Sequence, residues 1–98
     1  MLTAKNVADY IVTRCINNKT YINNRQLQDI LYQLHKKDNT LFNGTFKEAE
    51  WGHYELDVFY DYIHTGSMPI TTKPTNQNLI ILNTDIINQT VDNYLRKE

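Results

Sequence analysis

Few residues of this chain could act as nucleophiles or metal ligands, and none lies in a pattern that catalysis or metal binding needs. The one serine, Ser67, lacks the Gly-x-Ser-x-Gly turn of a hydrolase nucleophile. The one cysteine, Cys15, falls on an apolar helical stripe, where a buried and inert thiol is expected. His35, His53 and His64 have no histidine or cysteine four positions away. The sequence therefore predicts no catalytic centre and no metal site.

Cofactor binding and acid–base catalysis are not indicated either. The glycines Gly44, Gly52 and Gly66 do not have the spacing of a phosphate-binding loop, so no cofactor is expected. Glu48 and Glu50 alternate along a predicted strand, where solvated carboxylates are more typical than a tuned acid–base pair. We therefore expect the protein not to be an enzyme.

Aromatic and acidic residues offer a different chemistry, that of protein binding. The chain has seven Tyr, three Phe and one Trp, and several of these rings alternate with acids between residues 51 and 62. Such a mixture is typical of a protein-binding surface, because tyrosine provides contact area at low entropic cost. The alternative is that the rings fill a small core and only their hydroxyls reach the surface. The candidate partner-binding residues are Glu48, Glu50, Trp51, Tyr54, Glu55, Asp57, Tyr60 and Asp61.

Charge is distributed unevenly although the net charge is only −1. Residues 1–47 carry seven Lys and Arg against three acids, and residues 48–98 carry three against eight. The split indicates either two faces of opposite charge, one of which docks a partner, or solvated faces that compensate each other in the fold.

The elements that must position these residues begin with two amphipathic helices. The first runs from Thr3, a good N-cap, to about Ile16, and is expected to end at residues 17–18 because asparagine tolerates the left-handed conformation. The second is capped by Asn23 or Asn24 and ends near Lys37. Its apolar stripe comprises Leu27, Ile30, Leu31 and Leu34.

The rest of the chain predicts shorter elements. Residues 46–51 alternate like a half-buried strand that Gly52 ends, and residues 54–64 have a helical pattern. A loop or a hairpin edge is expected over 65–78, a buried strand over 79–82, and a helix that is capped by Asn83 or Thr84 and runs to about Arg96. The predicted fold class is α+β and mostly helical, with about four helices and a small antiparallel β element in one domain, residues 1–98.

Several of these segments, in order, resemble the Panacea, or SocA-like, antitoxin domain family, which includes phage-associated GepA-like proteins. Residues 4–11 are similar to its first helix, and residues 22–32 (INNRQLQDILY) to its most recognisable stretch. Leu41-Phe42 followed by residues 46–52 (FKEAEWG) resembles its strand, and Ile70 matches an isoleucine that follows a glycine-containing loop. The resemblance covers about residues 3–70. It implies a non-enzymatic protein that neutralises a toxin or delivers one to a protease, and that is encoded by a phage or mobile element.

The chain departs from the family in two places. Gly52-His53-Tyr54 stands where the family has Gly-Pro-Val, and the chain ends near where the family continues into further C-terminal helices. The partner surface is therefore expected to differ from that of the family.

Protein binding is the function that these observations favour. The expected partner is a toxin, a nuclease or another defence effector, and a close variant is a phage inhibitor of a host defence nuclease, of the anti-CRISPR type. A second alternative is a nucleic-acid-binding helix-turn-helix, in which the second helix would read bases with Arg25, Gln26, Gln28 and Gln33. The acidic second half makes nucleic acid the less favoured partner. An unpaired cysteine and the lack of an apolar segment long enough for a membrane predict a cytoplasmic location.

Overall fold

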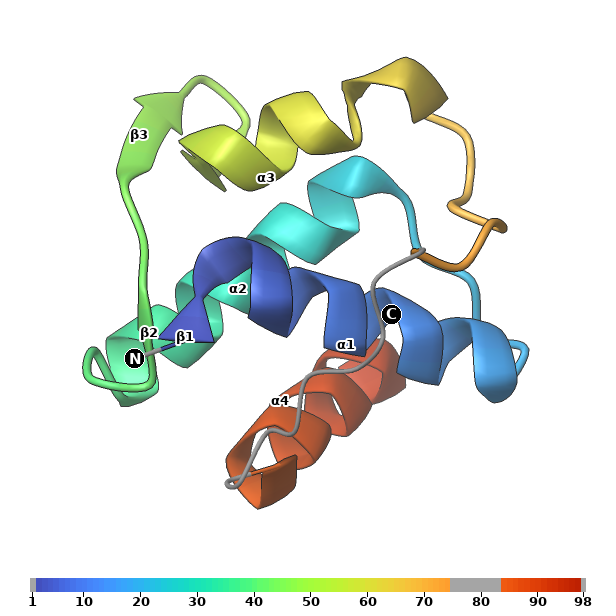
Figure 1. Ribbon diagram of the computed structural model, residues 1–98, viewed down its shortest axis with the longest axis horizontal. Coiled ribbons are helices and arrows are strands. Elements are labelled where there is room, and N and C mark those ends of the chain that lie inside the picture. The colour runs from blue at the N-terminus through green and yellow to red at the C-terminus, as the bar shows by residue number, and fades with distance from the viewer. Residues whose placement is uncertain (1, 75–83, 98) are drawn as a thin grey trace.

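The computed structural model describes residues 2–74 and 84–97, which form three layers (Figure 1). The central layer consists of α1 (Ala4–Asn17) and α2 (Asn24–Lys37). The hairpin of β3 (Phe46–Ala49) and β4 (Gly52–Glu55) lies on one side of it with α3 (Leu56–Asp61), and α4 (Thr84–Lys97) lies on the other. The predicted fold class, mostly helical α+β with a small antiparallel sheet, is confirmed.

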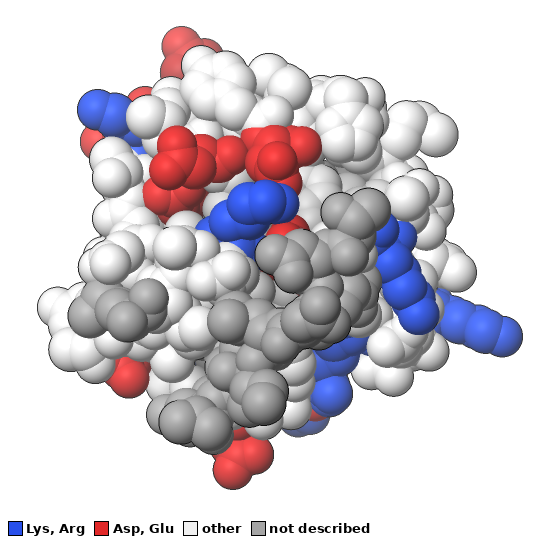
Figure 2. Space-filling view, in the orientation of Figure 1, with Lys and Arg blue, Asp and Glu red and all other residues white. Residues whose placement is uncertain are grey.

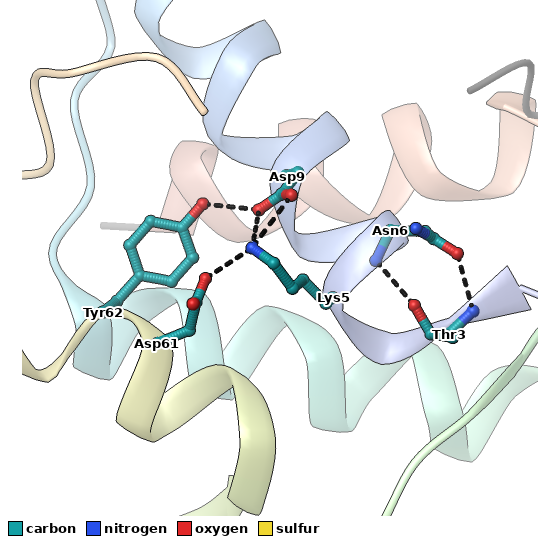
Figure 3. Close-up of polar contacts among 6 residues, drawn as sticks. All are labelled: Thr3, Lys5, Asn6, Asp9, Asp61 and Tyr62. Carbon is teal, nitrogen blue, oxygen red and sulfur yellow. Dashed lines mark hydrogen bonds and ion pairs between the residues drawn. The ribbon is translucent and has the colours of Figure 1, made fainter. Parts of the chain in front are cut away.

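The first helix begins as predicted and ends with a different residue in the left-handed conformation. The Thr3 hydroxyl accepts a hydrogen bond from the Asn6 backbone N–H, and the Asn6 side chain accepts one from the Thr3 N–H (Figure 3). At the C-terminus, Lys19 has φ +57° and Asn18 has φ −90°. The N–H groups of Lys19 and Thr20 donate to the carbonyls of Ile16 and Cys15, so Lys19 takes the position that usually favours glycine. The expectation that Asn17 or Asn18 would be left-handed is wrong.

The second helix follows its sequence signals closely. Asn23 is the N-cap, and its side chain exchanges hydrogen bonds with Gln26 in a capping box. The helix ends at Lys37, where lysines suit the negative end of the helix dipole. All four residues of the predicted apolar stripe are fully buried, so α2 forms the centre of the core.

The middle of the chain differs most from its prediction. The strand ends at Ala49, and Gly52, with φ +142°, does not end a strand but begins β4. Strand pairing of Lys47 with Tyr54 and of Phe46 with Glu55 keeps residues 54 and 55 extended. The expected helix over 54–64 is therefore shortened to α3, which is followed by a 3₁₀ turn, η1 (Ile63–Thr65). The alternating pattern could not indicate the second strand, because its side chains are all at least partly buried.

Two further connections were not predicted. β1 (Leu2–Thr3) pairs in parallel with β2 (Phe42–Asn43), and strands of two residues are too short to leave a periodic signal. Residues 66–74, after η1, form a loop as predicted, and the Ile70 N–H anchors it by donating to the Ile22 carbonyl at 2.8 Å. Residues 75–78 of the predicted loop lie outside the described residues. The strand predicted over 79–82 lies outside the described residues.

The last helix, α4, runs from Thr84 to Lys97, close to the predicted range, and buries Ile87 and Val91 against the core. Asn83, one of the two predicted caps, lies outside the described residues. Hydrogen bonds join α4 to the central layer in both directions. Tyr10 donates to Asn88 at 2.7 Å and Lys37 donates to Thr90 at 3.2 Å, while Tyr94 of α4 donates to Asp29 at 3.0 Å. Within the described ranges, none of the helices combines the length and the hydropathy that crossing a bilayer requires.

The uneven charge of the two halves is partly neutralised by ion pairs at the surface of the folded chain. Lys5 pairs with Asp61 and Arg14 pairs with Asp92, so two cations of the first half each contact an acid of the second. These contacts favour the interpretation that the two sets compensate each other. Figure 2 nevertheless shows acidic side chains gathered over the region of α3.

Candidate protein-docking surface

A buried polar network holds the hairpin and α3 on α2. The Glu55 backbone N–H donates to the Gln28 side-chain oxygen at 2.7 Å, and the Gln28 amide donates to Asn24 at 3.0 Å. Asn24 in turn donates to the Phe59 carbonyl at 3.1 Å. Gln28 is 0% exposed and Asn24 is 3% exposed, so these hydrogen bonds are shielded from water. The network fixes the positions of the side chains that project from the hairpin and α3.

Glu55 is not part of an exposed surface, in contrast to its predicted role. It is the last residue of β4 and is 2% exposed. Its carboxylate accepts hydrogen bonds from the backbone N–H groups of Thr45, Asp57 and Val58, at 2.6, 2.9 and 3.1 Å. Two of these donors lie in the first turn of α3, so Glu55 is the N-cap of that helix. Its side chain is a structural group that a partner does not reach.

Four rings gather where the hairpin meets α3, and we call them the aromatic cluster: Trp51, Tyr54, Phe59 and Tyr60. The Trp51 ring centroid lies 5.9 Å from that of Tyr54 and 6.1 Å from that of Phe59. Phe59 meets Tyr60 edge to face at 5.7 Å. Tyr60 is 60% exposed and the other three rings are half-buried, so the cluster serves both as packing and as surface.

One basic residue lies against the aromatic cluster. The guanidinium carbon of Arg25, from the first turn of α2, lies 5.3 Å from the centroid of the Trp51 ring. This is the range of a cation–π interaction. Neither Arg25 nor Phe59 was predicted as part of the surface. The contact joins residues 26 positions apart in the sequence, and no local pattern indicates it.

The predicted acids are divided between two places. Asp57 and Asp61 are four positions apart on α3 and therefore share one side of that helix, the side that faces the N-terminus of α1. Glu48 and Glu50 lie instead on β3 and in the hairpin turn, and both are exposed. The exposed Tyr60 lies on α3 between the side with the acids and the side that bears Phe59.

Asp61 belongs to a compact group of polar side chains (Figure 3). The Lys5 Nζ lies 2.6 Å from Asp61 and 3.2 Å from Asp9, and the Tyr62 hydroxyl donates to Asp9 at 2.7 Å. Burial, and then the hydrogen bond to Asp9, raise the pKa of Tyr62 well above its usual range. Partial burial lowers the pKa of Lys5, but the hydrogen bonds and charges of Asp61 and Asp9 outweigh it and raise the pKa overall. The group connects α1 to α3, so Asp61 is less available to a partner than its sequence position indicated.

The other acids of the predicted surface are not neutralised in this way. No ion pair among residues 2–74 and 84–97 includes Glu48, Glu50 or Asp57. Asp57 lies three positions before the exposed Tyr60 on α3, and Glu50 directly precedes Trp51. Such unpaired carboxylates can make charge-assisted hydrogen bonds to a basic partner.

Three of the residues considered for catalysis or metal binding, Cys15, His35 and His53, are found in packing positions, whereas His64 and Ser67 are exposed. Cys15 is buried in the core, and burial raises the pKa of its thiol, which lowers its reactivity. The His53 ring stacks on Tyr32 with centroids 3.9 Å apart, and His35 packs against Phe46 at 4.9 Å. No group of three or more His, Cys, Asp or Glu side chains in the described part of the chain is arranged to hold a metal ion.

No protein-family model, curated protein or solved structure that was compared with the chain matches it.

Proposed function

We propose that this protein is a non-enzymatic inhibitor that acts by binding another protein, in the manner of an antitoxin. The proposal depends on one observation, the aromatic cluster, whose Tyr60 ring is 60% exposed at the meeting point of the hairpin and α3. An exposed ring beside half-buried ones is typical of the anchors that carry the binding energy of protein interfaces. The polar network of Gln28 and Glu55 holds these rings in place before binding, which reduces the entropic cost of association.

The carboxylates near the cluster indicate a partner with a basic surface. Glu48 and Glu50 are exposed and unpaired, and complementary charge gives fast and correctly oriented association. A toxin or nuclease that binds nucleic acid has such a surface. The resemblance to the Panacea antitoxins supports the same class of function. The protein would then act in the cytoplasm, and its gene would be carried by a phage or mobile element. Inhibition of a host defence nuclease, of the anti-CRISPR type, is the closest variant.

The nucleic-acid alternative has less support. Of the four side chains proposed to read bases, Gln28 is buried, Gln26 forms part of the capping box, and Arg25 lies over Trp51. A helix whose reading side chains are used within the fold is poorly suited to the major groove. Titration with duplex DNA should therefore give no salt-dependent shift, and micromolar binding with a steep salt slope would favour this alternative instead.

Affinity capture followed by an activity assay tests the proposal. The immobilised protein is incubated with extract of the cells that carry its gene, and bound proteins are identified by mass spectrometry. The double variant Tyr60→Ala/Glu50→Gln should retain at least about tenfold less of a specific partner, since losing an anchoring ring and a charge costs more than about 1.4 kcal/mol. The purified partner should then lose its toxic or nuclease activity when the wild-type protein is added in equal amount.

Asn93→Lys is the matched control, because it changes the net charge by the same amount at an exposed position of α4, on the other side of the central layer. The Asn93→Lys control should retain the same amount of the specific partner as the wild-type protein. Equal capture by the double variant, or a captured protein whose activity does not change, would contradict the proposal.

A further inference from the structure

The contact between Arg25 and Trp51 shows what chemistry the aromatic cluster accepts. A guanidinium already lies 5.3 Å from the centroid of the Trp51 ring. Planar guanidinium groups stack on aromatic faces and are less strongly hydrated than ammonium groups. Among aromatic side chains, tryptophan attracts a cation over its face most strongly, through its ring quadrupole. The cluster therefore suits the side chain of arginine.

Arg25 is not strongly held in this position. Its side chain is exposed on the first turn of α2, and it forms no ion pair with any carboxylate of the described residues. An exposed cation–π contact contributes only about 0.5–1 kcal/mol. A competing guanidinium needs to overcome no more than this to replace Arg25 on the ring.

Negative charge beside the cluster adds a second attraction for such a competitor. Glu50 immediately precedes Trp51 in the hairpin turn and is exposed. Glu48 is also exposed on β3, but it pairs with His53 and therefore lies on the opposite face of the hairpin from Tyr54. Both carboxylates lack an ion-pair partner among the described residues. A carboxylate accepts two parallel hydrogen bonds from a guanidinium, which a lysine ammonium cannot provide. The ring face of Trp51 and the free carboxylate of the adjacent Glu50 together distinguish arginine from lysine.

We propose that the aromatic cluster is an arginine-binding site, in which Arg25 occupies the face of Trp51 until an arginine from a basic segment of the partner protein replaces it. This inference rests on the proposed protein-binding function and names the chemistry of the partner. Arg25 is then an internal competitor, and its contact with Trp51 protects the ring from water and from weakly basic proteins until the partner binds.

Titration with short peptides tests the site directly. Trp51 is the only tryptophan of the chain, so its fluorescence reports on the cluster without a label. A capped oligoarginine peptide should give a saturable change in emission, and an oligolysine peptide of equal length should bind more weakly. In Arg25→Gln the affinity for oligoarginine should rise about two- to fivefold, the ratio that corresponds to losing the competing contact.

The removal of any positive charge favours a cationic peptide, so Lys47→Gln serves as the control. Lys47 is exposed on β3 as the strand partner of Tyr54, so its charge lies near the cluster, but it makes no cation–π contact with a ring of the described residues. This variant should strengthen the binding of both peptides equally, and by less than Arg25→Gln strengthens that of oligoarginine. Trp51→Leu should abolish the preference for arginine in calorimetric titrations, and Trp51→Phe, which keeps a weaker ring face, should retain part of it.

Equal binding of the two peptides, or equal effects of Arg25→Gln and Lys47→Gln, would overturn the inference. If a partner is captured through Tyr60 and Glu50 while the wild type shows no preference for oligoarginine, the proposed function stands and the arginine site does not. If the double variant at Tyr60 and Glu50 captures the partner as well as wild type, and the peptide titration also shows no preference for oligoarginine, the proposed docking surface is wrong.

Discussion

The Glu55 backbone N–H donates to the side-chain oxygen of Gln28 at 2.7 Å, across 27 residues of sequence and inside the core. The Gln28 side chain of α2 accepts this backbone N–H, and the Glu55 carboxylate accepts the backbone N–H groups that precede β3 and begin α3. The docking surface therefore depends on two buried polar residues that do not themselves contact solvent.

Replacing Glu55 by alanine should destabilise the protein by about 2–4 kcal/mol. The change leaves the backbone N–H groups of Thr45, Asp57 and Val58 without their acceptor and removes the cap of α3. Urea unfolding followed by circular dichroism measures the loss. Glu50→Ala, at an exposed and unpaired acid of the same hairpin, should stay within about 0.5 kcal/mol of wild type. A similar result for Glu55→Ala would mean that the network contributes no stability.

Leu31→Ala should cost about 2–5 kcal/mol of unfolding free energy, because Leu31 is fully buried at the centre of α2 and its truncation leaves a cavity. The exposed Gln33 on the same helix provides the comparison, since Gln33→Ala should be nearly neutral. Equal effects of the two substitutions in urea unfolding would show that the core is not formed around α2.

Lys19→Gly should stabilise the protein by about 0.5–1 kcal/mol. Lys19 has φ +57°, a conformation that costs a residue with a Cβ more than it costs glycine. The gain is smaller than the full strain because glycine also increases the entropy of the unfolded chain. Thermal unfolding measures the shift. Asn18→Gly, at a neighbouring residue with φ −90°, should be neutral or destabilising, and stabilisation at both sites would point to a different cause.

Tyr62 should make stability fall at alkaline pH. The folded protein keeps its phenol protonated because the pKa is raised, whereas the unfolded chain releases this proton near pH 10. The contribution is fully present below about pH 10 and is lost as the pH rises above it. In Tyr62→Phe the unfolding free energy should be lower by about 1 kcal/mol at neutral pH, since Asp9 loses a hydrogen-bond donor.

Above about pH 10 the Tyr62→Phe variant should lose stability less steeply than wild type, by up to about 1.4 kcal/mol per pH unit, which corresponds to one proton. Urea unfolding at several pH values gives both slopes. Parallel slopes for wild type and Tyr62→Phe would show that this phenol ionises in the folded state.

The sequence by itself determined the helices of the central layer. Thr3 and Asn23 mark their starts by side-chain hydrogen bonds to residues three positions away, and the stripe that includes Leu31 marks the buried face of α2. These signals are local, because capping and helical periodicity involve residues within one or two turns of each other. The start of α4 and the mostly helical fold class could be predicted for the same reason.

Only the tertiary structure decided which of the predicted surface residues belong together. Strand pairing extended residues 54 and 55, so Glu55 turned inward to cap α3 instead of facing a partner. The pairing of Lys5 with Asp61 and the position of Arg25 over Trp51 likewise join segments that are far apart in sequence. Such contacts form because the packing of the core brings these segments close together. A pattern read along one segment carries no information about the charge or ring that another segment places beside it.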